Sequence, residues 1–133
     1  MVTLCGEKAL DVLKQARAKL KTWPLRMARR GPLYFVLECE ERKDCLGSST
    51  VVQEGKTCGS CGRVASRVVK GPTYLKPGLR TGPMFSTRRT FGSAAMGEWM
   101  FPLEFVTRDL SSLMKKAGLK GVGLEPCLHE KKS

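Results

Sequence analysis

The chain has 133 residues, with 24 Lys and Arg against 12 Asp and Glu, so its formal net charge is +12. This length suits one modest domain, and the positive excess favours a polyanionic partner such as nucleic acid, an anionic membrane or an acidic protein face. No apolar run approaches the roughly 18 residues of a transmembrane helix, so we expect no membrane-spanning segment. Charge at Glu7 and Lys8 precedes any apolar region, which argues against a secretory signal.

Residues 7–23 are predicted to form an amphipathic helix that ends before Pro24. Its apolar residues recur at spacings of three and four, which places them on one helical face. They are Ala9, Leu13, Ala16, Leu20 and Trp23. No acid occurs from residue 12 to residue 37, whereas Lys and Arg accumulate there. The segment is therefore a candidate phosphate-binding arm or mitochondrial targeting segment, with a solvated charged face as the simpler alternative.

Residues 31–70 are predicted to form a small β-core. An apolar, aromatic and β-branched run over 33–37 indicates a buried strand, and the segments 50–52 and 63–69 indicate two more. Between the last two lies Thr57-Cys58-Gly59-Ser60-Cys61-Gly62-Arg63. Gly62 can adopt a positive φ without steric cost, which leaves backbone N–H groups free to hydrogen-bond thiolates. This loop has the knuckle geometry of a structural zinc site.

Four cysteines with the spacing C-x5-C-x12-C-x2-C are the predicted ligands of one zinc ion. They are Cys39, Cys45, Cys58 and Cys61. Cys127 and His129, the single histidine, are alternatives for the fourth ligand. Without an export signal, metal-bound or free thiols are favoured over disulfides. A redox pair at the knuckle is a further alternative, but it needs a helix after the motif, and the Val/Arg alternation that follows is typical of a strand.

Cys39-Glu40-Glu41 followed by Cys58-Gly59-Ser60-Cys61-Gly62 resembles the zinc ribbon of the nuclear-encoded zinc subunit of cytochrome oxidase. It is also similar to the ribbons of small zinc-binding ribosomal proteins. The resemblance covers residues 33–70 and implies a ribbon that folds around zinc. The oxidase subunit has two cysteines one residue apart in its first half. Leu37 stands at that place here, so Cys45 would have to substitute for that ligand.

Residues 71–101 are predicted to form an extended basic arm. Gly-Pro and Pro-Gly pairs interrupt this segment every five or six residues, which disfavours regular helix and any central strand. Tyr74, Phe85 and Phe91 alternate with cations, so such an arm could follow phosphates and stack on bases. A disordered linker is the alternative.

A second amphipathic helix is predicted over 103–117. Pro102 suits its first position, Lys115 and Lys116 suit its last turn, and Gly118 is expected to end it. Leu110 and Leu113 are predicted to lie on its apolar face together with Leu103, Val106, Met114 and Ala117.

These elements predict an α+β fold. A small three-stranded zinc-ribbon-like sheet would be flanked by an N-terminal and a C-terminal amphipathic helix, with the Gly/Pro-rich arm extended from it. The predicted segments are the N-terminal helix over 1–30, the ribbon core over 31–70, the arm over 71–101, the C-terminal helix over 102–118 and a tail over 119–133.

The sequence offers little for catalysis. It has one histidine, no Walker loop and no G-x-G-x-x-G motif, so we expect neither an enzyme nor a small-molecule substrate. The predicted function is a mitochondrial structural subunit of a ribonucleoprotein, with RNA or a large multi-subunit assembly as its partner. The alternative is a zinc-binding accessory subunit of a mitochondrial respiratory complex. The predicted RNA-contacting residues are Arg17, Lys21, Arg26, Arg29, Arg30, Arg63, Arg67, Lys70, Lys76, Arg80, Arg88 and Arg89.

Overall fold

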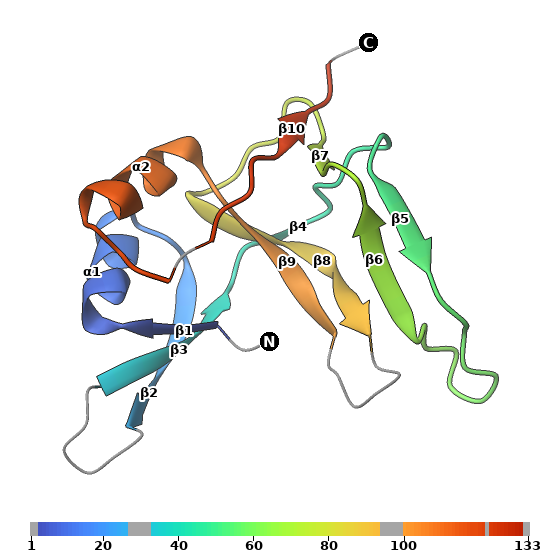
Figure 1. Ribbon diagram of the computed structural model, residues 1–133, viewed down its shortest axis with the longest axis horizontal. Helices are drawn as coiled ribbons and strands as arrows, with labels where there is room; N and C mark the ends of the chain where they lie inside the picture. The colour runs from blue at the N-terminus through green and yellow to red at the C-terminus, as the bar shows by residue number, and fades with distance from the viewer. Residues whose placement is uncertain (1–2, 27–32, 94–99, 122, 132–133) are drawn as a thin grey trace.

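A computed structural model describes residues 3–26, 33–93, 100–121 and 123–131. Within these ranges the chain forms ten strands and two nine-residue helices (Figure 1). The strands are β1 (Thr3–Gly6), β2 (Leu20–Arg26), β3 (Leu33–Cys39), β4 (Arg42–Lys43), β5 (Val51–Glu54), β6 (Ser66–Lys70), β7 (Tyr74–Leu75), β8 (Met84–Ser93), β9 (Met100–Val106) and β10 (Leu128–His129). The helices are α1 (Glu7–Gln15) and α2 (Arg108–Lys116). Neither described helix has the length and apolar character needed to cross a membrane.

The strands belong to three sheets. The first is antiparallel, with the order β1-β3-β2. The second is built around β8, which pairs with β9 along one edge and with β4 and β6 along the other, while β5 lies outside β6. The third is a short parallel pair of β7 and β10. Strands from the predicted ribbon, arm and C-terminal segments thus pair with one another and do not fold separately.

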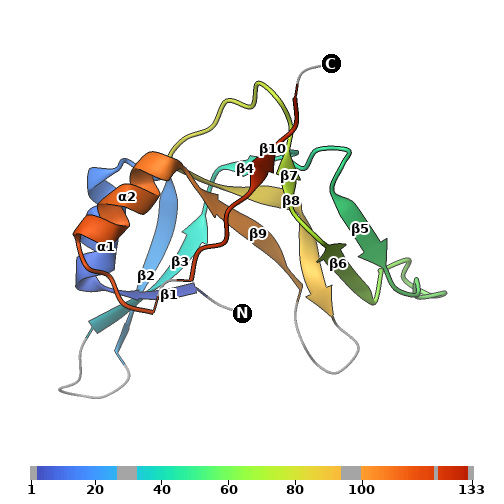
Figure 2. The ribbon, with the colours of Figure 1, turned by 45° about the horizontal axis from the view of Figure 1, so that its top comes forward.

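The predicted α+β fold is therefore wrong, because the described chain is mostly β. The expected three-stranded ribbon is divided between two sheets, since β3 belongs to the first and the β5–β6 hairpin to the second. The two helices contact each other at one end of the molecule and do not flank a ribbon (Figures 1 and 2).

Strands β8 and β9 separate two hydrophobic cores. Their register pairs Met84 with Val106 and Phe85 with Phe105. Successive side chains of a strand point to opposite faces of the sheet. Met84 and Val106 accordingly join the first core, while Phe85 and Phe105 join the second, where their rings stack with centroids 5.2 Å apart.

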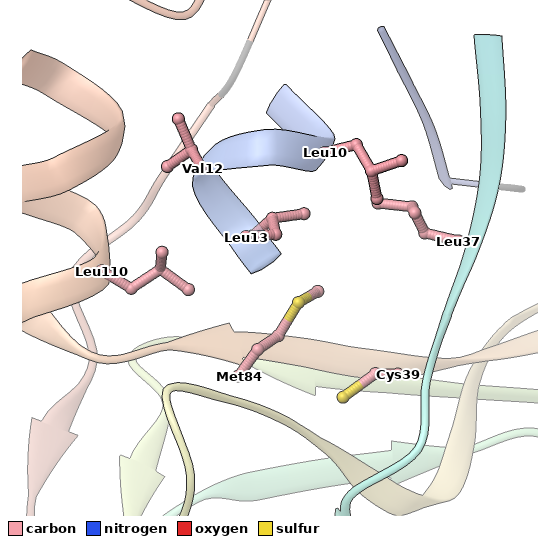
Figure 3. Close-up of a cluster of buried hydrophobic side chains, with 7 residues drawn as sticks. All are labelled: Leu10, Val12, Leu13, Leu37, Cys39, Met84 and Leu110. Carbon is pink, nitrogen blue, oxygen red and sulfur yellow. The ribbon is translucent and has the colours of Figure 1, made fainter. Parts of the chain in front are cut away.

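The first core joins both helices to β3 and β8 (Figure 3). Its buried residues are Leu10, Val12, Leu13, Leu37, Cys39, Met84 and Leu110. The second core lies on the other face of β8 and β9. Its buried residues are Cys45, Leu75, Phe85 and Phe105.

Helix α1 ends eight residues before the predicted end at residue 23, because the chain turns at Arg17. Arg17 has a φ of 62° and donates its N–H to the carbonyl of Lys14 at 3.0 Å, while Ala18 donates to Leu13 at 3.1 Å. This pair of bonds is the Schellman arrangement that closes many helices. Leu20 and Trp23, predicted on the helical stripe, lie instead in β2.

Strand β2 forms because its residues can pair with the apolar strand β3. Leu20 lies opposite Cys39, and Thr22 lies opposite Leu37. Pro24 is tolerated because β2 is an edge strand, where a missing N–H does not interrupt a ladder.

The predicted helix over 103–117 is also shorter in the structure. Thr107 caps α2, and its Oγ1 accepts a hydrogen bond from the Leu110 N–H at 3.4 Å. Residues 100–106 form β9 instead, with Pro102 on its open edge. The expected end at Gly118 is confirmed: its φ is 67°, and Leu119 donates to Met114 in a second Schellman arrangement.

The prediction of an extended arm over 71–101 is wrong as well. The Gly-Pro and Pro-Gly pairs at 71–72, 77–78 and 82–83 lie in the connections between strands, whereas β8, which occupies the centre of the segment, is the longest strand of the described chain. The residues from 94 to 99 lie outside the described ranges.

The two helix ends provide a matched test of backbone conformation. Replacing Arg17 by Gly should stabilise the protein by about 0.5–1 kcal/mol, because the left-handed conformation strains any residue with a Cβ. Replacing Gly118 by Ala should destabilise it by about 1 kcal/mol for the same reason, since an added Cβ meets no atom closer than 3.9 Å. Urea unfolding measures both values. A loss of stability in Arg17→Gly would contradict the described turn.

The two leucines of α2 should differ sharply in their contributions to stability. Leu110 is 1% exposed, whereas Leu113, predicted to share its apolar face, is 43% exposed. Leu110→Ala should lower the free energy of unfolding by about 2–5 kcal/mol, and Leu113→Ala should change it by no more than about 0.5 kcal/mol. Equal losses in urea unfolding would show that both side chains are buried.

Candidate nucleic-acid interface

A bulge in β8 presents two consecutive arginines on the surface. Ser86 pairs with Glu104 and Thr90 pairs with Pro102, so three residues of β8 lie opposite the single residue Leu103. Such insertions redirect side chains that would otherwise alternate between the two faces of a sheet. Arg88 and Arg89 are consequently both exposed.

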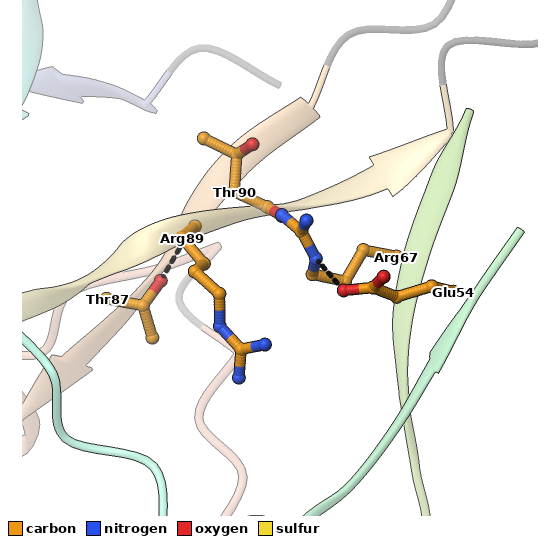
Figure 4. A network of polar contacts seen from close by, with 5 residues as sticks. All are labelled: Glu54, Arg67, Thr87, Arg89 and Thr90. Atoms are coloured by element: carbon orange, nitrogen blue, oxygen red, sulfur yellow. Dashed lines mark hydrogen bonds and ion pairs between the residues drawn. The ribbon is translucent and has the colours of Figure 1, made fainter. Parts of the chain in front are cut away.

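Thr87 holds the bulge in place from its buried position. Its Oγ1 donates a hydrogen bond to the carbonyl of Arg89 at 2.6 Å (Figure 4). It also accepts a hydrogen bond from the Leu103 N–H at 2.9 Å. One hydroxyl thereby satisfies a carbonyl and an amide left unpaired by the irregular register. The conformation of the arginine pair depends on this side chain.

Lys76 and Asp44 lie beside the bulge. Lys76 Nζ donates a hydrogen bond to Asp44 Oδ2 at 2.9 Å. Lys76, followed by Arg89 and Arg88, holds the pKa of the Asp44 carboxyl below its ordinary value. Three cations thus surround one exposed carboxylate. We call Lys76, Arg88 and Arg89 the bulge surface.

The bulge surface retains unused positive charge. The four ion pairs within the described part of the chain take their cations from Arg42, Lys43, Arg67 and Lys76. Arg88 and Arg89 form none of these pairs. The Arg89 guanidinium lies 5.9 Å from the centre of the Phe91 ring, and its side chain points away from β8 (Figure 4).

Arg67, another predicted RNA contact, has a structural role. Its Nε donates a hydrogen bond to Glu54 Oε1 at 3.0 Å, and its Nη1 donates to the Thr90 carbonyl at 2.9 Å. The guanidinium therefore ties β6 to β5 and to the end of the bulge (Figure 4). Arg67 is therefore not part of the candidate interface, because Glu54 neutralises its charge and its donors are bonded to Glu54 and Thr90.

The remaining predicted RNA contacts lie in several places. Arg17 is in the turn after α1, Lys21 on β2, Arg63 at the tip of the β5–β6 hairpin, Lys70 at the end of β6 and Arg80 in the connection to β8, and all five are exposed. Arg26 ends β2, but its side chain lies outside the described residues, as do Arg29 and Arg30. The predicted stacking residue Phe91 is buried and cannot face a base.

An open cleft lies between the first two sheets, on the face of β8 that bears Ser86. Its volume is about 260 Å³, and it is lined by Trp23 and Val36 of the first sheet and by Phe101 and Pro102 of β9. Trp23 is 48% exposed. The prediction of a helix over 7–23 placed this indole on a buried apolar face, so it did not identify Trp23 as an exposed side chain that could contact a ligand. The segment 20–26 reads Leu-Lys-Thr-Trp-Pro-Leu-Arg, which does not alternate apolar and polar residues, so the sequence carried no local signal for this strand.

The structure does not bring the four predicted zinc ligands together. Cys39 is buried in the first core and Cys45 in the second, whereas Cys58 and Cys61 are exposed at the hairpin tip. The described residues contain no group of three or more His, Cys, Asp and Glu arranged to hold a metal ion. Cys127 packs beside the second core, and His129 lies in β10, so neither completes a site at the tip.

The tight turn predicted at Gly62 is present. Cys58 donates its N–H to the Arg63 carbonyl at 2.8 Å, and Gly62 donates to the Cys58 carbonyl at 3.0 Å. Gly62 has the expected positive φ, 71°. Hydrogen bonds from the Cys61 and Ser60 backbone, and then from the Cys61 thiol, lower the pKa of the Cys58 thiol.

The buried cysteines have the opposite electrostatic environment. Burial raises the pKa of the Cys39 thiol, and a hydrogen bond with the Glu41 backbone offsets only part of the effect. Burial likewise raises the pKa values of the Cys45 and Cys127 thiols.

Alkylation should therefore distinguish three classes of thiol: exposed, partly buried and buried. Iodoacetamide reacts with the thiolate, so Cys58 should react rapidly and keep its rate to a lower pH than Cys127. Cys39 and Cys45 should react only after unfolding, because they are buried. Mass spectrometry of peptides across a pH series measures each rate. Native labelling of Cys45 as fast as that of Cys58 would contradict the described core.

Comparisons with protein-family models, with curated proteins and with solved structures found no match to this chain. The function must therefore be argued from the geometry of the molecule itself.

Proposed function

We propose that the protein is a non-enzymatic nucleic-acid-binding protein that contacts single-stranded RNA phosphates through the bulge surface. The observation that carries this proposal is the bulge, which exposes Arg88 and Arg89 side by side. Arginine guanidinium groups bind phosphate oxygens in bidentate geometry. The neighbouring Lys76 is paired with Asp44, so the unpaired positive charge at this place is that of the two arginines.

The overall charge supports the same partner. A formal charge of +12 attracts polyanions over long distances and raises the association rate. The exposed Lys21 and Trp23 on β2 are a second combination of cation and aromatic ring that single-stranded RNA could use. A ribonucleoprotein subunit in mitochondria is the most specific form of this proposal, and the acid-free basic segment near the N-terminus is what favours that location.

RNA binding should depend strongly on salt. Assuming roughly three to four phosphate contacts at about 0.7 released ions each, the slope of log K against log salt should be about −2 to −3. Neutralising both arginines (Arg88→Gln with Arg89→Gln) should reduce the magnitude of this slope by about 1 to 1.4. Fluorescence anisotropy with a labelled oligouridylate measures the slope.

The matched control is Lys115→Gln with Lys116→Gln, which removes the same charge from exposed positions of α2. This control should lower affinity less and leave the slope closer to that of the native protein. Equal effects of the two double variants would show that net charge alone attracts RNA, and the bulge proposal would fail. A slope near zero, with a protein partner that stays bound after nuclease treatment, would favour the accessory-subunit alternative.

A further inference from the structure

The β5–β6 hairpin carries its two cysteines away from the rest of the chain. It lies at the end of the molecule opposite the helices, and its loop projects outward in both views (Figures 1 and 2). Val64 forms a bridge with Thr57, and Ala65 donates its N–H to the Lys56 carbonyl at 2.8 Å. These contacts hold the loop as a defined turn.

The turn has the features of half a zinc site. Cys58 and Cys61 are both exposed, and the hydrogen bond from the Gly62 N–H to the Cys58 carbonyl at 3.0 Å closes the turn that carries them. Gly62 turns the chain directly after Cys61 with a φ of 71°, the tight turn that a zinc knuckle has. Paired thiolates select soft or borderline ions such as Zn²⁺. A structural zinc site has four ligands, however, and within the described residues only these two are present at the tip.

We propose that two copies of the chain share one Zn²⁺ ion through Cys58 and Cys61 of each copy. The two hairpin tips then supply four thiolates in tetrahedral geometry, and a two-fold axis through the metal closes the assembly. Because the tip is exposed and carried on a projecting hairpin, a second tip can approach it without rearrangement of either core.

The charge of the hairpin tip suits this arrangement. Zn²⁺ with four thiolates has a net charge of −2. Lys56 and Arg63 flank the cysteine pair and are exposed, so two copies bring four positive charges around the metal. Cations beside a metal thiolate centre stabilise its negative charge. Without the metal, the same residues would keep two tips apart.

The proposal is tested by titrating the reduced full-length protein with ZnCl₂ and measuring its mass by light scattering. The mass should double, with one zinc per two chains, and excess EDTA should return the monomer. CoCl₂ in place of zinc should give the visible absorption of a tetrahedral tetrathiolate site. Cys58→Ser and Cys61→Ser should each abolish both signals, whereas the matched control Cys127→Ser should retain them.

Alkylation of the exposed thiols before metal addition gives a second readout without a substitution in the chain. Iodoacetamide-treated native protein should remain monomeric in zinc. One zinc per chain in a monomer, dimerisation that survives Cys58→Ser, or cobalt binding without the tetrathiolate spectrum would each overturn the proposal. The outcome is independent of RNA affinity, because the metal test uses no nucleic acid.

Discussion

The pairing of β8 with β9 is the constraint on which the rest of the structure depends. Successive residue pairs of this ladder contribute side chains to different cores. Met84 and Val106 face the helices, whereas Phe85 and Phe105 face Cys45 and Leu75. A shift of one residue in either strand would exchange the faces of its side chains and place each of them in the wrong core. The two cores therefore depend on a single register.

The bulge follows directly from this constraint. Both Ser86 and Phe91 are buried, and the register of β8 against β9 shifts between them. The extra residues of β8 therefore bulge outward at the surface. Thr87 satisfies the backbone groups that the irregularity leaves unpaired, and the arginines after it face solvent. The candidate interface is thus held rigidly by the core, while its cations themselves contribute little to folding. Because the core fixes the backbone of the bulge, the arginines need little further ordering when they bind a ligand.

Local signals in the sequence predicted some features well. The strand over 33–37, the turn at Gly62 and the helix end at Gly118 are all found in the structure, because each depends on a few neighbouring residues. The predicted helices over 7–23 and 103–117 were too long because Leu20 and Trp23, and likewise Leu103 and Val106, lie three residues apart and so fit a helical stripe. Residues three apart lie on opposite faces of a strand, so no alternation of apolar residues marked β2 or β9. These residues form strands because β2 pairs with β3 and β9 pairs with β8, and neither partner could be identified from the local sequence. No local pattern could have predicted the bulge, which arises from the register of two strands.

The separation of the cysteines shows why spacing alone does not define a metal site. In a compact ribbon, the strand that ends at Cys39 would lie beside the knuckle. Here β3 joins the first sheet, and burial against Met84 makes the Cys39 thiol part of a core. Cys45 is likewise buried in the second core. Among the described residues, the Gly62 turn keeps its local hydrogen bonds but has neither of the other two predicted cysteines beside it, so correct spacing of four cysteines did not bring four thiols together.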